Sequence, residues 1–504
     1  GTFTVSAGTA AAYRTAIFST TLGTTRTLTC AAISFTDTDF RDITIAGAAS
    51  PASGTRLGDC KGNSGITFPA AKTVYYRQTG SADWGATGSG SWSATSGSAL
   101  DATQFPLAQD TAIFPAATYP ASGSTTTINA AYNIGTIDMS LRTSNTLTLS
   151  HLVASPVIYG NWINGTGITN AAGNNPITFA GRTTQQITSS GIPFTQTITI
   201  NSPSGSVTLQ DALTTSATNT TTLTNGTLDI QSYTLSTGLF SSSNSNTRTI
   251  AFGTGNITCT GTGIVWTTST VTGLTTTGTQ VVNVTSTATT PTTITVTTGA
   301  LSEANSISYN FTGGTYVLSV ANLSGHSVRN LNFTGYAGAA QLSSSGSVIY
   351  GNLLLSSGMT VTATANAMSF RATSGTQTIT TNSQTLDLPL TFNGVGGTFQ
   401  LQDALTMGST RTATLTNGTL DLFGKTLTVG TAFTTATGTK NLTFNGGTLV
   451  CPAASTVAFN NAVPTGFTTT AGTGVGVISM TAATAKRFVG GGSTFNCTLN
   501  QGGA

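Results

Sequence analysis

The sequence predicts an all-β protein: an elongated parallel β-helix, or β-solenoid, built from a duplicated block of about 192 residues, with a smaller β-rich region at the N-terminus. Three observations lead to this fold class. Threonine alone makes up more than a fifth of the 504 residues. Only 6% of the residues are charged, against about 25% in a typical soluble domain. A phrase of 21 residues occurs twice, at a fixed spacing.

The composition indicates an ordered chain that hydroxyl and amide groups keep in solution. Thr, Val, Ile and Phe favour strands, while Gly and Asn favour turns. The 17 basic and 14 acidic residues are spread thinly and give a net charge of +3, so the sequence carries no basic patch for nucleic acid. No stretch approaches 18 apolar residues, and we therefore expect no membrane insertion.

The repeated phrase defines the duplicated block. Leu209–Asp229 and Leu401–Asp421 agree at 16 of 21 positions, at a constant shift of 192 residues. The agreement continues more weakly to Cys259 and Cys451, and upstream to "VIYGN" at 157–161 and 348–352. Such self-similarity is typical of solenoids, in which successive copies stack on one another.

Within each block, short alternating runs lie between Asn-Gly, Gly-Gly or Ser-Gly turns. "NLTFNGGTLVC" at 441–451 places Leu442, Phe444, Leu449 and Cys451 on an inward face. Antiparallel hairpins in stacked sandwiches and rungs of a parallel β-helix would both suit this pattern. The solenoid is favoured, because a block of 192 residues is too long for one immunoglobulin-like domain and divides into about eight to ten rungs.

We predict four regions. Residues 1–71 form a β-rich N-terminal region, a candidate partial repeat, since "GTFTVS" at 1–6 is similar to "GTYVLS" at 314–319. Residues 72–115 form a junction rich in Trp, Gly and Ser that opens the solenoid. Residues 116–340 form a β-solenoid with the first block at about 150–340, and 341–504 form a second, truncated block. The chain begins at Gly1 without a methionine, which we interpret as processing or as a segment of a longer polypeptide.

No motif points to catalysis, and we predict that the chain is not an enzyme and needs no cofactor. Four aspartates are internal duplicates, because Asp211 matches Asp403 and Asp229 matches Asp421. A residue that recurs in each block serves the block, most simply by capping a turn. The remaining acids are scattered, whereas glycoside hydrolysis needs a pair of carboxyl groups.

The densest acidic cluster is "FTDTDFRD" at 35–42. Asp37, Asp39 and Asp42 are weak candidates for calcium ligation, since Asp37 and Asp39 would share one face of a strand. The favoured interpretation is that these carboxylates are solvated and paired with Arg41. His151 and His326 have no acidic neighbours in sequence and are expected on loops or polar faces. Cys259 and Cys451 are expected to be buried, unpaired core residues, while a Cys30–Cys60 bridge is an open alternative.

The junction carries Tyr75, Tyr76, Trp84 and Trp92 among Gly- and Ser-rich loops. Aromatic rings combined with Asn, Ser and Thr side chains can recognise sugars. We therefore consider these four residues candidate surface-contact aromatics. The competing interpretation is that they pack the cap of the solenoid.

Two phrases carry a family resemblance. The second block, from "SGSVIYGNLLLSSG" to "TFQLQDALTM", and the closing "AKRFVGGGSTFNCTLNQGGA" are similar to repetitive virion proteins of tailed bacteriophages. The "W…W…P…DxAxF" pattern at 84–114 is similar to the opening segment of β-solenoid surface proteins. The resemblance implies an extracellular structural or adhesive role and, by analogy, a homotrimer.

Two function hypotheses follow from the resemblance. The first is a structural component of a phage virion appendage, a fibre or surface projection, on the virion exterior. Its partners would be other copies of the chain, other virion proteins and a host-surface glycan. The second is a secreted bacterial β-solenoid adhesin or extracellular filament subunit.

Overall fold

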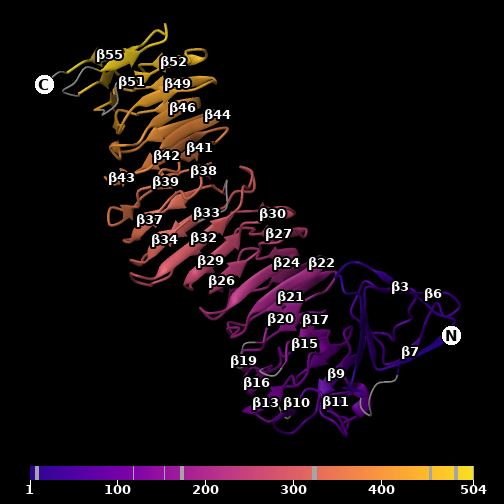
Figure 1. The fold of residues 1–504 in the computed structure, drawn as a ribbon. Helices are drawn as coiled ribbons and strands as arrows, with labels where there is room; N and C mark the ends of the chain where they lie inside the picture. The colour runs from indigo at the N-terminus through magenta and orange to yellow at the C-terminus, as the bar shows by residue number, and fades with distance from the viewer. Residues whose placement is uncertain are drawn as a thin grey trace. The chain divides into compact units, whose positions relative to one another are not determined.

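The computed structural model describes residues 1–5, 11–116, 119–151, 154–170, 175–320, 326–452, 457–481 and 486–502. The chain is almost entirely β-structure and forms a parallel β-solenoid of about 21 turns, which confirms the predicted fold class. One antiparallel pair joins β9 (Thr73–Tyr76) to β11 (Trp92–Ser93). No helix among the described residues is long and apolar enough to cross a membrane. In Figure 1 the strands of successive turns lie side by side.

The chain divides into two compact units. The first comprises residues 1–241, 245–257 and 272–279, and the second comprises 242–244, 258–271 and 280–504. Each unit contains one complete copy of the repeated phrase, Leu209–Asp229 in the first and Leu401–Asp421 in the second. The region boundaries at 71, 115 and 340 that were derived from sequence stay predictions.

The N-terminal region is a small three-sided parallel β-helix of its own, here called the N-terminal β-helix. Its strands visit three sheets in succession, so that each turn stacks on the previous one. Phe35, Phe40, Ile43, Ile45 and Leu57 fill its core. The three sheets are β1 (Thr2–Val5), β4 (Ala32–Thr36) and β7 (Gly54–Thr55); β2 (Thr15–Phe18), β5 (Thr38–Arg41) and β8 (Gly58–Asp59); and β3 (Arg26–Thr29) with β6 (Ile43–Ala46).

The main solenoid of the first unit begins at β9, on which β12 (Thr111–Ile113) pairs in parallel. β15 (Thr136–Asp138) and β18 (Trp162–Ile163) continue the same ladder. A neighbouring sheet contains β10 (Ala82–Asp83), β13 (Ser124–Thr127), β16 (Leu147–Ser150) and β19 (Ile168–Asn170).

The duplicated phrase folds into the same structure twice. Its core is a pair of long strands, β22 (Ile198–Leu209) with β24 (Thr220–Asp229) in the first block and β44 (Leu390–Leu401) with β46 (Ala413–Asp421) in the second. Both pairs shift their register on both sides of equivalent residues, Asn201 and Asn393. The sequence repeat is therefore a structural repeat at the level of individual pairings.

Amide ladders mark these interruptions. Asn225 Nδ2 donates to Asn201 Oδ1 at 2.7 Å, and Asn417 Nδ2 donates to Asn393 Oδ1 at 2.8 Å. A primary amide both donates and accepts, so one Asn can pair with the Asn of the turn above. This is why Asn recurs at the same place in successive turns.

The predicted inward positions are confirmed. Leu209, Leu401, Phe252 and Phe444 are fully buried. Equivalent core positions stack in register from turn to turn: Ile349 pairs with Phe370, and Phe370 pairs with Phe392. The Phe370 and Phe392 rings are stacked, with centroids 5.4 Å apart.

The thiols also follow the prediction. Cys259 and Cys451 are buried and free, and burial raises the pKa of each thiol to about 12. Cys30 and Cys60 are free as well, so the alternative of a bridge between them is not realised.

One buried cation recurs in each block at the same corner. Lys440 is almost fully buried, and its Nζ donates to the carbonyls of Gly438 and Thr465 at 3.0 and 2.9 Å. Arg248, 192 residues earlier, donates from Nη1 to the carbonyls of Asn246 and Thr272. These cations satisfy carbonyl groups just before the strands begin, because a buried acceptor without a donor costs free energy.

This duplication generates a prediction for Lys440. Lys440→Met should destabilise the second unit by about 1–3 kcal/mol, because two buried carbonyls lose their donor. Lys440→Arg should cost less, since Arg makes the same contacts at position 248. Thermal unfolding midpoints of the two variants provide the measurement, and equal losses for both would contradict this role of the side chain.

Candidate functional site

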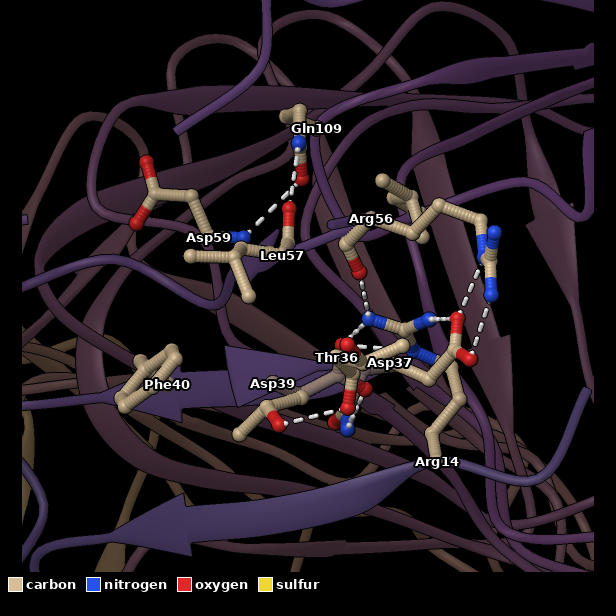
Figure 2. A network of polar contacts seen from close by, with 12 residues as sticks. Arg14, Thr36, Asp37, Asp39, Phe40, Arg56, Leu57, Asp59 and Gln109 are labelled. Carbon is tan, nitrogen blue, oxygen red and sulfur yellow. Dashed lines mark hydrogen bonds and ion pairs between the residues drawn. The ribbon is translucent and has the colours of Figure 1, made fainter. Parts of the chain in front are cut away.

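The predicted acidic cluster lies inside the N-terminal β-helix, where it forms an ion-pair network. Asp37 accepts two hydrogen bonds from Arg56, from Nε at 2.5 Å and from Nη2 at 2.7 Å. Arg14 donates from Nε and Nη2 to Asp39 Oδ1, at 2.7 and 2.5 Å, and from Nη2 to the carbonyl of Arg56. Figure 2 shows the guanidinium of Arg14 between the backbone of Arg56 and the two aspartates.

The same network reaches the main solenoid. Arg182 Nη2 donates to both carboxylate oxygens of Asp42, at 2.8 Å each. Asp42 also accepts a hydrogen bond from the backbone N–H of Gly23. Asp39 Oδ2 accepts from Asn133 Nδ2 at 2.9 Å. These bonds join positions 140 and 94 residues apart in the sequence, so they attach the N-terminal β-helix to the solenoid of the first unit.

Gln109 adds a neutral contact between the two parts. Its Oε1 accepts from the backbone N–H of Asp59 at 2.9 Å, and its Nε2 donates to the carbonyl of Leu57 at 3.0 Å (Figure 2). A small apolar patch lies in the same region, where Cys60, Ala108, Tyr159 and Ala180 pack together. Burial raises the pKa of the Cys60 thiol well above its usual value.

The sequence interpretation of this cluster is wrong in two respects. The carboxylates of Asp37, Asp39 and Asp42 are buried rather than solvated. Their partners are Arg14, Arg56 and Arg182, whereas the Arg41 guanidinium lies 4.3 Å from the centroid of the Phe18 ring. A buried carboxylate needs a desolvated partner, and the fold brings those partners from distant turns.

The calcium hypothesis depended on a shared strand face, and the geometry differs. Asp37 and Asp42 have left-handed backbone conformations, with φ of 50° and 56°, at the two ends of β5. Only Asp39 lies within the strand. Among the described residues, no group of three or more His, Cys, Asp or Glu is arranged to hold a metal ion.

The candidate surface aromatics also need correction. Tyr76, Trp84 and Trp92 are buried, and Tyr75 is half-buried. The ring centroids of Trp84 and Trp92 are 4.6 Å apart in an edge-to-face arrangement, and Trp92 Nε1 donates to the Trp84 carbonyl. The surface-contact hypothesis is wrong for the three buried residues. They fill the core at the first turn of the main solenoid, where β11 pairs with β9, as the competing interpretation held.

The duplicated aspartates cap equivalent turns. Asp211 accepts from the backbone N–H groups of Ser189 and Ser190, and Asp403 accepts from those of Thr381 and Asn382. Asp229 and Asp421 likewise accept from the N–H two residues further on, at Gln231 and Phe423. All four aspartates therefore have the structural role that their recurrence predicted.

The other acids are engaged in a similar way. Glu303 accepts from the backbone and hydroxyl of Thr373, and Asp387 pairs with Arg411 at 2.6 Å. Asp110 accepts from two backbone N–H groups, while burial raises its pKa. Each of the 14 carboxylates accepts at least one hydrogen bond from the protein; the rest are Asp59, Asp83, Asp101 and Asp138.

The two histidines lie in loops between strands, as expected, but both are buried. The Ser347 hydroxyl is hydrogen-bonded to His326 Nε2, and burial lowers the pKa of both His326 and His151 to about 4. Among the described residues, neither ring forms a hydrogen bond or an ion pair with a carboxylate. Both therefore behave as neutral core residues at pH 7.

Two clefts lie beside the N-terminal β-helix within the first unit. The first, of about 390 Å³, is lined by Tyr13, Arg14 and Asp39 together with residues 130–133. The second, of about 590 Å³, lies between Leu22–Gly23 and the corners of three solenoid segments at 203–205, 225–227 and 245–249. Sequence reasoning missed both clefts, since no short motif marks residues that meet only after folding.

Comparisons of the chain with protein-family models, with curated proteins and with solved structures find no match.

The docking network generates a prediction for Arg182. Arg182→Ala should weaken attachment of the N-terminal β-helix by roughly 3–5 kcal/mol, because Asp42 keeps a buried charge without its partner. The measurement is limited proteolysis of residues 1–71 during a urea titration. Arg411→Ala is the matched control, because it also removes an arginine from an ion pair. Its partner Asp387 is 36% exposed, so the free energy of unfolding should fall by less than about 1 kcal/mol.

A double variant tests whether the unpaired charge of Asp42 causes this weakening. Asp42→Asn combined with Arg182→Ala should recover much of the loss, since the buried charge is gone and the amide oxygen still accepts from Gly23. Equal protease sensitivity for Arg182→Ala and Arg411→Ala would refute the docking role.

The buried histidines predict a loss of stability in acid. Their folded pKa of about 4 lies below the value of about 6.5 in an unfolded chain. The unfolded state therefore binds protons first as pH falls, and stability that is complete above pH 6.5 declines towards pH 4, on the order of 3 kcal/mol per histidine. Thermal unfolding from pH 7 to 4 measures it, and an unchanged pH profile in His151→Asn/His326→Asn would contradict it.

Proposed function

We propose that this chain is a structural component of a phage virion appendage, a fibre or surface projection that takes part in attachment to the host surface. The observation that supports it best is the parallel β-solenoid itself, in which duplicated turns repeat the same pairings, ladders and caps. Such an architecture extends by adding turns and presents a continuous surface. The biological setting is proposed from the resemblance of the second block's phrases to repetitive virion proteins, as described from the sequence, and on that ground alone.

The chain acts by binding and building, without catalysis. Transition-state stabilisation in glycoside hydrolysis needs one carboxyl group as acid and another as base or nucleophile. The carboxylates here are engaged in turn caps, backbone contacts or ion pairs, as described above. Attachment makes lighter demands, because hydroxyl, amide and backbone groups can recognise a glycan. In this proposal the chain lies on the virion exterior, assembles with copies of itself, as a trimer by analogy, and contacts other virion proteins.

Electron microscopy with a labelled antibody against the purified chain tests the location. We expect label on the surface of phage particles from the source culture, and none on uninfected cells. Label confined to bacterial cell surfaces would replace the proposal with the alternative, a secreted adhesin or filament subunit. Release of reducing sugar ends from host polysaccharide by the purified chain would contradict the non-catalytic role.

A further inference from the structure

The larger cleft is built by stacked turns. Asn201 pairs with Asn225 and Gly226 with Arg248, so the corner segments 203–205, 225–227 and 245–249 belong to successive turns. Neighbouring turns of a parallel sheet are about 4.8 Å apart. The cleft therefore presents hydroxyl and amide groups from three successive turns, with Leu22 and Gly23 of the N-terminal β-helix as its other wall.

Its lining is polar but carries little charge. Hydroxyl and amide side chains dominate, among them Ser204, Asn225, Thr227 and Thr247. Arg248 is the one charged residue in the lining; it is buried and donates to backbone carbonyls. Leu22 and Pro203 supply apolar surface. Sugars combine hydroxyl groups that donate and accept with apolar C–H faces, so their chemistry matches this lining.

The wall is held in place rather than resting loosely on the surface. Asp42 accepts from the backbone N–H of Gly23 and binds Arg182 on the solenoid side. Arg182 Nη1 also approaches the carbonyl of Pro203 at 3.5 Å. The ion pair therefore fixes the distance between the two walls, and a preformed cleft loses less entropy on binding a ligand.

The second block provides a comparison. Val395, which corresponds to the half-buried Pro203, is 65% exposed, whereas Thr247 and its counterpart Thr439 are both exposed. The corner fold is the same, with Gly396 at φ of 89° and Ser204 at 63°. The duplicated corner thus exists once as part of a cleft and once as an open surface.

We infer that the cleft between the N-terminal β-helix and the first block binds a segment of a neutral carbohydrate chain. Its volume of about 590 Å³ lies within the range of roughly 300–1,000 Å³ that small-molecule sites occupy. The inference deepens the proposed attachment function and rests on it only for the biological source of the glycan.

Affinity electrophoresis of the full-length chain in native gels tests the inference, with dextran, laminarin or yeast mannan cast into the gel. Retardation by at least one of these neutral polymers is expected. Thr247→Trp, which fills the cleft, should weaken it at least tenfold. Thr439→Trp places the same ring on the open corner of the second block and should leave the retardation unchanged, while unaltered thermal midpoints confirm that both variants fold.

Two results would overturn the inference directly: no retardation by any of the three neutral polymers, or equal effects of the two tryptophan variants. A third uses a gel that contains the acidic polymer alginate: retardation by alginate alone, abolished by 0.5 M salt, would also overturn it. The last result would show binding driven by charge. The assay is independent of where the protein resides. Retardation without label on virions would refute the proposed function alone, and label on virions without retardation would refute the cleft alone.

Discussion

Within each unit, successive turns of the solenoid lie directly on one another, in register, and the other features depend on that stacking. In a parallel ladder every side chain has, about 4.8 Å away, the residue at the same position of the next turn. A charge at a repeating outward position would therefore face its own sign, whereas an amide or an aromatic ring gains a partner. The Asn201–Asn225 bond and the Phe370–Phe392 stack are examples. The low charge and the abundance of Thr and Asn follow from this constraint.

Charged groups are placed where stacking does not repeat them. Aspartates cap turns by accepting backbone N–H groups, as Asp211 and Asp403 do, and the buried cations at 248 and 440 donate to backbone carbonyls. The acidic cluster of the N-terminal β-helix differs, because its three carboxylates form ion pairs with three guanidinium groups instead of capping turns. Desolvating such pairs is costly, and their value is geometric. They specify how the N-terminal β-helix docks on the first unit.

Sequence reasoning predicted the parts of the structure that periodicity encodes. The inward placement of Leu209 and Phe444 and the capping by Asp229 follow from alternation and from the 192-residue shift. It failed where the decisive neighbour is distant in sequence. No residue near Asp42 in the sequence indicates that Arg182 is its partner, so solvated carboxylates were expected. Likewise, nothing in the Gly- and Ser-rich junction indicates that Trp84 and Trp92 point into the core. The clefts were not predicted for the same reason, because the walls of each come from segments far apart along the chain.

The matching geometry of the two long strand pairs has a consequence for how such a chain changes over generations. Leu209–Asp229 and Leu401–Asp421 are alike in sequence, and the strand pairs that contain them shift register at equivalent asparagines, Asn201 and Asn393. Unequal recombination between the two coding segments would remove or add 192 residues and join one strand pair to the continuation of the other. Both sides of the junction would keep the pairing that they had before. The protein can thus gain or lose a whole set of turns in one genetic event, and its reach can vary between lineages without a new fold having to arise.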